Sequence, residues 1–448
     1  MSSASSPAAP STSLLSVLKS PRVWLMLALG FSSGLPLYLT GSTLSAWMTN
    51  EGVSLKTIGI FSLVGVSYTF KFVWSPLLDR YFPPFLGRRR GWLVIAQVLL
   101  AGAIFAMGQV NPRTDAVAMA ALAALVAFLS ASQDIVVDAY RTDLLSPQER
   151  AFGVSVFTLG YRVGMVVALA VALILSDYIG WKYTYAAMAA FMVVGLVATL
   201  LSPEPVADSP PLTLLDAVAK PFADFYQRGW PTILALVFIV VFRVGDAVAY
   251  RMTTPFILKL GFTNTEYGLI TKLPGMFGSI SGALVGGLLV TKLGVRRSLY
   301  LFGSAQALTN LLYVALASHG KDDVFLGFTV ASDNFTGGMG GAAITVFMTA
   351  LCNRNFSATQ YALISSLSAV PMQVLGAASG YLAEGLGWSN FYIFTTIAMA
   401  PALILLAFIP GSVGQDIQPE AAAEHLTRPT VAPEAIAELS ASAKKGAG

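Results

Sequence analysis

The sequence predicts an all-α integral membrane protein made of two six-helix bundles. Hydrophobic residues make up 55% of the chain and charged residues only 11%, whereas about a quarter of the residues in a soluble domain are charged. Apolar segments of about 20 residues, the length that an α-helix needs to cross a bilayer, recur about twelve times along the 448 residues. A polar stretch rich in proline and charges separates two sets of six.

Taken in order, the chain starts with a Ser/Ala/Pro-rich arm over 1–20, which we expect to be disordered. The first bundle, 21–202, contains spans near 22–47, 57–79, 91–110, 116–144, 150–176 and 182–202. Residues 203–229 form the linker, which we expect in the cytoplasm. The second bundle, 230–410, contains spans near 230–260, 266–291, 297–318, 323–352, 358–384 and 388–410. The Ala/Glu/Pro-rich tail 411–448 is again expected to be disordered.

The positions of the basic residues predict the orientation of these spans. If both termini face the cytoplasm, only five basic loop residues lie on the other side of the membrane: Lys56, Arg113, Lys182, Lys259 and Lys321. Short cytoplasmic loops are enriched in Lys and Arg, so this asymmetry favours cytoplasmic termini. The net charge of +4 and the pI near 9.0 then reflect topology, and binding to nucleic acid is not expected.

The two halves contain similar short segments in the same order. The pairs are Phe31-Ser-Ser-Gly34 with Phe242-Arg-Val-Gly245, Gly52–Gly59 with Gly261–Gly268, and Ala131-Ser-Gln-Asp134 with Ala331-Ser-Asp-Asn334. Internal repeats of this kind are typical of transporters, whose substrate sites lie between the repeats. We therefore expect two parallel repeats that face each other across a central cavity, although chance similarity among apolar helices would give the same matches.

A polar stripe interrupts the fourth span. Its members recur at three- and four-residue spacing and so share one helix face: Ser130, Gln133, Asp134, Val137, Asp138 and Arg141. An ionised carboxylate in a bilayer costs about 2.5–3.5 kcal/mol unless it has a partner, a cavity or a proton. We interpret Asp134 and Asp138 as proton-coupling groups, because burial beside a second carboxylate favours protonation. The structural alternative is a static ion pair with Arg162 or Lys71.

Further charged and polar residues lie inside the predicted spans. The cations are Lys71, Arg162, Arg243, Arg251 and Lys272, and the carboxylates are Asp134, Asp138, Asp246 and Asp333. This excess of positive charge predicts a cavity for an anionic solute. As substrate-binding residues we select Tyr38, Lys71, Gln133, Tyr161, Arg162, Arg243, Asp246, Tyr250, Lys272, Asp333, Asn334 and Gln373. For each Tyr and Gln, ordinary helix packing is the alternative.

Two loops resemble the signature Gly-x-x-x-Asp-Arg-x-Gly-Arg-Arg of the major facilitator superfamily. The first runs from Leu77-Leu-Asp-Arg to Gly87-Arg-Arg-Arg, and the second contains Thr291-Lys-Leu-Gly-Val-Arg-Arg. Ser75 stands where the first glycine is expected, and Thr291 stands at the acidic position of the second copy. The resemblance implies a cytoplasmic gate made of Asp79, Arg80, Arg88, Arg89, Arg141, Arg296 and Arg297. The alternative is that these basic residues set the topology alone.

Long strings in the first half resemble the AmpG muropeptide permease family. They lie between Leu29 and Trp92 and over Gln133-Asp-Ile-Val-Val-Asp-Ala-Tyr-Arg-Thr-Asp143. The resemblance implies a permease of the bacterial inner membrane that imports N-acetylglucosaminyl-1,6-anhydro-N-acetylmuramyl peptides (anhydromuropeptides) from periplasm to cytoplasm. It further implies a proton gradient as the energy source, without a cofactor, and roles in cell-wall recycling and β-lactamase induction. A monomer in the lipid bilayer is expected.

Other functions remain as alternatives. Another anionic solute, such as an acyl-coenzyme A, would suit the same architecture. A membrane-embedded enzyme or a receptor is less favoured, because Cys352 is the single cysteine, His319 and His425 lie outside the spans, and no sizeable soluble domain is present. The same scarcity of ligands argues against a metal site. Gly337–Gly341 resembles a phosphate-binding loop in composition but lacks the following Lys-Ser/Thr.

Overall fold

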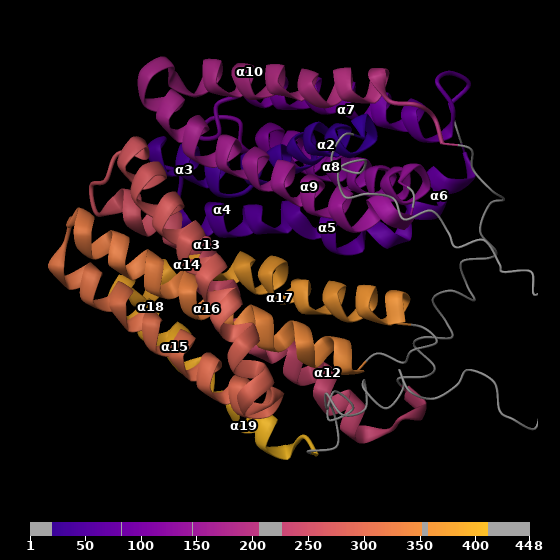
Figure 1. Ribbon diagram of the computed structural model, residues 1–448. Coiled ribbons are helices and arrows are strands. Elements are labelled where there is room, and N and C mark those ends of the chain that lie inside the picture. The colour runs from indigo at the N-terminus through magenta and orange to yellow at the C-terminus, as the bar shows by residue number, and fades with distance from the viewer. Residues whose placement is uncertain (1–19, 82, 146, 206–225, 352–356, 411–448) are drawn as a thin grey trace, which may run out of the picture.

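The computed structural model describes residues 20–81, 83–145, 147–205, 226–351 and 357–410. All regular secondary structure in these ranges is helical, and the helices form two bundles (Figure 1). This confirms the predicted fold class. Residues 1–19, 206–225 and 411–448 lie outside the described ranges, so the disorder of the two tails and the interior of the linker remain predictions.

The first half consists of α2 (Pro21–Leu39), α3 (Ser42–Asn50), α4 (Leu55–Ile60), η1 (Phe61–Gly65), α5 (Val66–Phe70), η2 (Lys71–Val73), α6 (Ser75–Arg80), α7 (Arg88–Met107), α8 (Ala116–Leu144), α9 (Pro147–Val166), η3 (Val167–Val171) and α10 (Ala172–Leu201). The second half consists of α12 (Trp230–Phe242), α13 (Val244–Lys259), α14 (Asn264–Leu293), α15 (Val295–His319), α16 (Asp323–Leu351), α17 (Ser357–Leu386), α18 (Trp388–Ile397) and α19 (Ala400–Phe408).

Nine helical stretches of the described chain are long and apolar enough to cross a membrane. One of them, Gly153–Leu201, holds two of the expected spans, because Gly180 turns the chain within α10 at a φ of 75°. The second expected span is divided into the short pieces from α4 to α6. The tenth corresponds to α16, which carries Asp333 and Asn334 among its glycines and is not one of the nine.

Several predicted spans are interrupted where the local sequence cannot continue a helix. Gly41, at φ −104° and ψ −109°, separates α2 from α3. Pro76 lies in the first turn of α6 and Pro401 in the first turn of α19, where the missing N–H costs nothing. Neither proline could continue the preceding helix without losing a backbone hydrogen bond. These breaks leave non-helical backbone within the bundles or at their ends.

The two halves repeat the same turns, as the sequence similarity predicts. Gly52 and Gly261 have φ values of 73° and 95°, a region that favours glycine. A capped helix follows each of them: Ser54 accepts a hydrogen bond from the backbone N–H of Thr57, and Thr263 accepts one from that of Glu266. Gly180 and Gly387 likewise share φ values of 75° and 73°.

Small residues allow very close helix packing within each half. Gly30 and Gly34 of α2 face Gly160 and Gly164 of α9, and a Cβ atom at any of the four would overlap backbone of the opposite helix. In the second half, Gly282 of α14 lies against Phe335 of α16 in the same manner. Such small-residue spacing is how membrane helices bring their backbones together.

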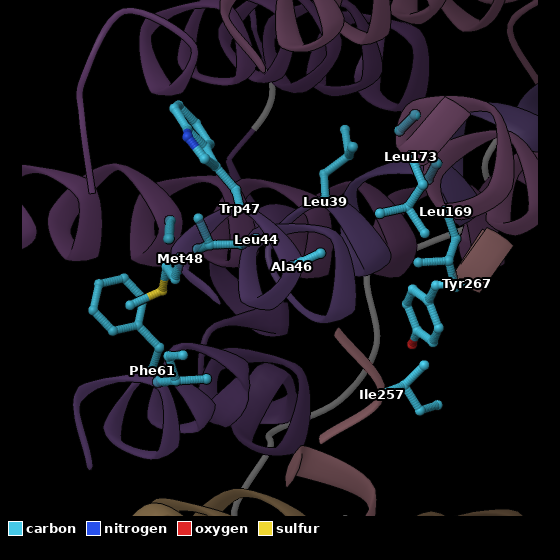
Figure 2. Close-up of a cluster of buried hydrophobic side chains, with 14 of the residues drawn as sticks. Leu39, Leu44, Ala46, Trp47, Met48, Phe61, Leu169, Leu173, Ile257 and Tyr267 are labelled. Carbon is cyan, nitrogen blue, oxygen red and sulfur yellow. The ribbon is translucent and has the colours of Figure 1, made fainter. Parts of the chain in front are cut away.

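The buried apolar side chains divide differently at the two ends of the molecule. We call the end that holds residues 202–205 and 226–229 the linker end, and the end that holds the turns 51–54 and 260–263 the far end. At the far end a single cluster includes Leu44 and Trp47 from the first half and Ile257 and Tyr267 from the second (Figure 2). At the linker end each half has a cluster of its own.

Candidate functional site

A cavity of about 670 Å³ lies between the two halves. Its volume lies within the range of about 300–1,000 Å³ that is typical of small-molecule sites. The first half contributes residues of α2, α3, α9 and η3, and the second half contributes residues of α13 to α17 and Arg243, which joins α12 to α13. Both halves therefore contribute to the wall of the cavity.

Charged groups of opposite sign share the cavity wall. Among the side chains that the structure describes, Arg162, Arg243, Asp246 and Asp333 line the cavity. Arg243 and Asp246 interact electrostatically, and Asp333 accepts a hydrogen bond from Tyr313 Oη at 3.2 Å. The described lining is thus balanced in charge, whereas the sequence predicted an excess of cations.

Eight of the twelve residues selected as substrate-binding line this cavity: Tyr38, Tyr161, Arg162, Arg243, Asp246, Tyr250, Asp333 and Asn334. Three others lie off it. Gln133 donates to Ser33 Oγ at 3.2 Å, Lys71 lies 3.9 Å from Asp138, and Gln373 accepts from Arg251 at 2.9 Å. The side chain of Lys272 lies outside what the structure describes.

Asp134 and Asp138 are not part of the cavity lining; they lie on α8 beside the first-half segment η2. Asp138 pairs with Arg141 at 3.1 Å and with Lys71 at 3.9 Å, and its side chain is 50% exposed. Asp134 differs, because its Oδ1 atom is buried without a hydrogen-bond partner in the described chain. The ion pair with Lys71 that we considered is present for Asp138, and neither aspartate pairs with Arg162 in this conformation.

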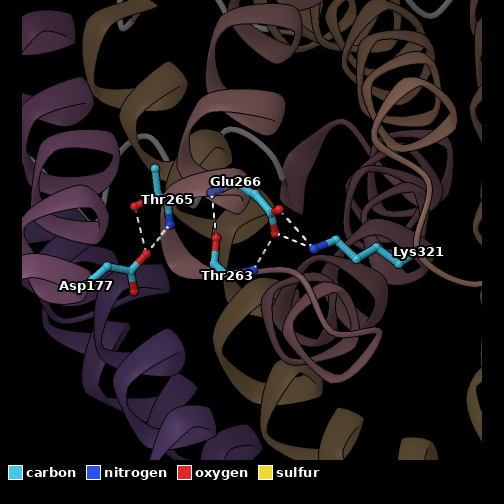
Figure 3. A network of polar contacts seen from close by, with 5 residues as sticks. All are labelled: Asp177, Thr263, Thr265, Glu266 and Lys321. Carbon is cyan, nitrogen blue, oxygen red and sulfur yellow. Dashed lines mark hydrogen bonds and ion pairs between the residues drawn. The ribbon is translucent and has the colours of Figure 1, made fainter.

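At the far end, one carboxylate from each half reaches a helix start in the other half. Asp177 of α10 accepts hydrogen bonds from both the backbone N–H and the hydroxyl of Thr265 at 2.7 Å (Figure 3). It also accepts one from Asn264 Nδ2 at 3.0 Å. Glu384 of α17 accepts from the backbone N–H of Leu55 at 3.0 Å and pairs with Lys56 at 3.3 Å. We call these two contacts the far-end clasps.

The clasps are equivalent by the internal repeat. Asp177 lies three residues before Gly180, and Glu384 lies three residues before Gly387. A carboxylate is stabilised at a helix start by the free N–H groups and the helix dipole. Every hydrogen bond and ion pair described between the two halves lies toward the far end, including the bond from Ser62 Oγ to the carbonyl of Gln373 at 2.7 Å.

Three of the residues predicted to form a gate have described partners, all within their own half. Arg89 pairs with Asp143 at 2.9 Å, and Arg141 pairs with Asp138 and stacks on Phe157. Arg296 donates to the carbonyls of Ile409 and Ala407. Arg88 is half-buried and Arg297 is exposed. The side chains of Asp79 and Arg80 lie outside what the structure describes.

Sequence reasoning missed several residues of the cavity and of the seam between the halves. Gln306, Asn310 and Tyr313 of α15 line the cavity, and their spacing of three to four residues along an apolar helix was an available signal. Asp177 and Glu384 were not selected, because each lies near the end of a span, where a carboxylate is common. Their positions three residues before paired glycines would have marked them as equivalent.

Comparisons with known proteins agree with this architecture. The sequence model described as Major Facilitator Superfamily matches residues 26–377. The chain is 48% identical over 401 residues to the anhydromuropeptide permease of Escherichia coli (strain K12), covering 88% of this chain and 81% of that protein. It is 32% identical over 404 residues to a protein of Rickettsia conorii named "Putative transporter AmpG 4", covering 88% of this chain and 97% of that protein.

Solved structures with the same fold are more distant in sequence. The nucleoside transporter NupG has a TM-score of 0.64 at 15% identity, covering 87% of this chain and 99% of that one. A D-xylose-proton symporter has a TM-score of 0.63 at 13% identity, covering 90% and 100%. At such identities the likeness shows the fold alone.

Proposed function

The chain belongs to the major facilitator superfamily and to the family of the anhydromuropeptide permease, and on this premise we propose that it imports anhydromuropeptides with protons. It is a membrane transporter rather than an enzyme. The observation that carries the proposal is the 48% identity, over 88% of the chain, to a permease named for that substrate. The energy source is the proton gradient, and no cofactor takes part.

The composition of the cavity supports a substrate of this kind. An anhydromuropeptide combines two sugars with a peptide that carries several carboxylates. Arg162 and Arg243 are placed to bind carboxylates, because a guanidinium offers paired donors that match the two oxygens. Tyr38, Tyr161 and Tyr250 line the same space and offer both hydroxyl groups and ring faces to sugars.

The distribution of the basic residues supports an orientation of the chain in the membrane. We place the linker end in the cytoplasm of a bacterial cell and the far end in the periplasm, with both termini cytoplasmic and the chain in the inner membrane. The far-end contacts then close the periplasmic side, so this conformation faces inward. Alternating access requires those contacts to open and the linker end to close. The imported products would enter cell-wall recycling and β-lactamase induction.

Asp134 and Asp138 are the proposed proton-coupling groups. The Oδ1 atom of Asp134 is buried without a hydrogen-bond partner among the described residues. Binding a proton would lower the free-energy cost of burying this carboxylate. Asp138 is held by Lys71 and Arg141 and can exchange these partners when α8 moves. A proton taken from the periplasm would be released once the site faces the cytoplasm.

Transport into proteoliposomes tests the proposed function. Purified protein should accumulate labelled anhydromuropeptide when the outside is made acidic, and the lumen should acidify as substrate enters. Excess unlabelled anhydromuropeptide should compete, whereas an acyl-coenzyme A should not. Competition by the coenzyme A ester alone would instead favour the carrier of another anionic solute. Accumulation that follows a sodium gradient would refute proton coupling.

Variants of α8 test the proton site separately. Asp134→Asn and Asp138→Asn should each abolish gradient-driven accumulation while leaving the protein folded. Asp115→Asn is the matched control, because Asp115 precedes the same helix and its side chain bonds only to the hydroxyl of Thr114 among the described residues. Normal accumulation in both test variants would refute the assignment without affecting the substrate.

A further inference from the structure

Arg251 of α13 is a largely buried cation for which the described chain provides no counter-ion. Its Nη2 atom donates to Gln373 Oε1 at 2.9 Å. Its Nε atom is buried and has no hydrogen-bond partner, and no carboxylate of the described chain forms an ion pair with it. Enclosing a charge without an opposite charge is costly to the fold. A neutral amide partner does not remove that cost, so a role outside this conformation is needed to explain the residue.

A small polar void of about 20 Å³ adjoins Arg251 at the seam between the halves. Ser42, Ser45, Ser62 and Thr254 contribute hydroxyl groups to its wall, and the buried Oγ of Ser45 also lacks a hydrogen-bond partner among the described residues. A void of this size and polarity is large enough for about one water molecule. Thr254 lines the main cavity as well, so the void lies directly beside the cavity.

The two halves contribute different sides of this void. Arg251 and Gln373 both belong to the second half, on α13 and α17. Ser45 on α3 and Ser62 on η1 belong to the first half and line the same void as Arg251. Gly376 leaves room for this arrangement, because a Cβ atom there would lie 3.0 Å from Arg251 Cγ and 3.2 Å from Ser62. When the halves part at the far end, the first-half wall of the void moves away and Arg251 stays with Gln373.

We propose that Arg251 is the loading-side anion site, which binds a carboxylate of the substrate when the far end is open. This inference rests on the proposed function, because import makes the far side the side of entry. In the closed conformation Gln373 binds the Nη2 atom of the guanidinium. The remaining donors stay available for a carboxylate. Arg251 thus selects acidic substrates at entry, before the solute reaches the main cavity.

The position of Arg243 completes the path. Arg243 precedes α13 and lines the main cavity, and eight residues of helix place it about 12 Å from Arg251 along the axis. A solute with several carboxylates can therefore contact one arginine before it leaves the other. The first site is reached from the far side, and the second remains accessible in the conformation described here.

Substrate charge separates this role from a structural one. In Arg251→Gln the KM for uptake of an anhydromuropeptide tripeptide should rise about tenfold or more, as expected for losing a hydrogen bond to a charged group. The KM for the same compound with its peptide carboxyls amidated should change less than twofold. Arg251→Lys should recover part of the loss. Lys259→Gln is the matched control, since Lys259 is an exposed cation at the end of the same helix.

Chemical accessibility tests the geometry without relying on transport. In a Cys352→Ser background, Arg251→Cys should react with a membrane-impermeant thiol reagent added from the periplasmic side, and anhydromuropeptide should slow the reaction. Labelling only from the cytoplasmic side would overturn the proposal. So would an equal rise in KM for the acidic and the amidated compound. If wild-type protein takes up neither compound, the proposed function fails, and the side of labelling still decides whether Arg251 faces the entry side.

Discussion

At the far end, Asp177 and Glu384 each bind a helix start in the opposite half, whereas at the linker end Arg89 and Arg296 bind partners in their own half. The buried apolar side chains follow the same division, with one cluster shared at the far end and separate clusters at the linker end. Contacts that cross between the halves bias the conformational equilibrium, while contacts inside one half stabilise that half in every conformation.

The cross-half contacts are of a kind that can be broken during a transport cycle. Glu384 and Lys56 are partly exposed, and such pairs contribute about 0.2–1 kcal/mol. The Asp177 contact adds hydrogen bonds to a charged acceptor, worth about 1.5–3 kcal/mol. Contacts of this size close one end without locking it. Changing them one at a time should therefore shift populations rather than unfold the protein.

The largest expected effect comes from the glycine contact beneath the Glu384 clasp. A Cβ atom at Gly380 would overlap the carbonyl oxygen of Leu55 across the seam. Because backbone atoms cannot move aside as a side chain can, Gly380→Ala should destabilise the conformation with the far end closed by about 3 kcal/mol. This is near the upper end of the usual range for overpacking. The far end should open and uptake should fall about a hundredfold. Distances between spin labels at Lys182→Cys and Lys259→Cys, in a Cys352→Ser background, report the opening.

Gly385→Ala provides the control for that substitution. Gly385 lies on the same helix, and a Cβ atom there meets nothing within 4 Å. Alanine should stabilise an exposed helix by up to about 1 kcal/mol relative to glycine, without moving the spin-label distances. If the spin-label distances in Gly380→Ala were as unchanged as those in Gly385→Ala, the two halves would not come into contact at Gly380 during transport.

The double variant Asp177→Asn with Glu384→Gln should have the next largest effect. Each substitution keeps an acceptor oxygen but removes the charge, so we expect a loss of about 0.5–1 kcal/mol at each clasp. The clasps join different helices, so their effects should add. Together they should raise the far-end-open population about tenfold in the same spin-label measurement. A double variant that shifts no more than either single variant would show that one clasp alone closes this end.

Much of the fold was predictable from composition and periodicity. Apolar length predicts the spans, and repeated turn signals such as Gly52 and Gly261 predict two similar halves. The breaks within spans were harder to predict. Gly41 and Arg243 lie at helix ends inside predicted spans, where the polar intervals 40–43 and 243–246 are too short to mark a loop. Tertiary packing of the two bundles decides these positions, and hydropathy does not report it.

The cavity was predictable only in part, for a geometric reason. Polar residues inside apolar helices are easy to find, and Arg243, Asp246 and Asp333 do line it. A sequence does not show which polar helix faces are turned toward the other half and which pack within their own half. Asp138 faces Lys71 within the first half instead. Predicting this difference needs the relative rotation of α8, which is set by its neighbours rather than by its own pattern.

A substitution at the linker end should lower stability without changing the conformational equilibrium. The side chain of Arg89 is only 10% exposed and pairs with Asp143. Asp143→Asn should lower the free energy of unfolding of the first half by about 1–2 kcal/mol, because it weakens a charge-assisted bond. The far-end spin-label distances should remain those of the wild type. A shift in those distances would contradict the view that this pair acts within one half.

The smallest effects come from two ion pairs that differ mainly in what they join. Lys56 pairs with Glu384 across the halves, while Lys321 pairs with Glu266 within the second half (Figure 3), and both pairs are partly exposed. Each is worth less than about 1 kcal/mol. Lys56→Gln should raise the far-end-open population about twofold, and Lys321→Gln should leave it unchanged. Because the two pairs are alike in exposure and chemistry, equal shifts in both variants would mean that general surface charge, and not contact across the seam, controls the opening.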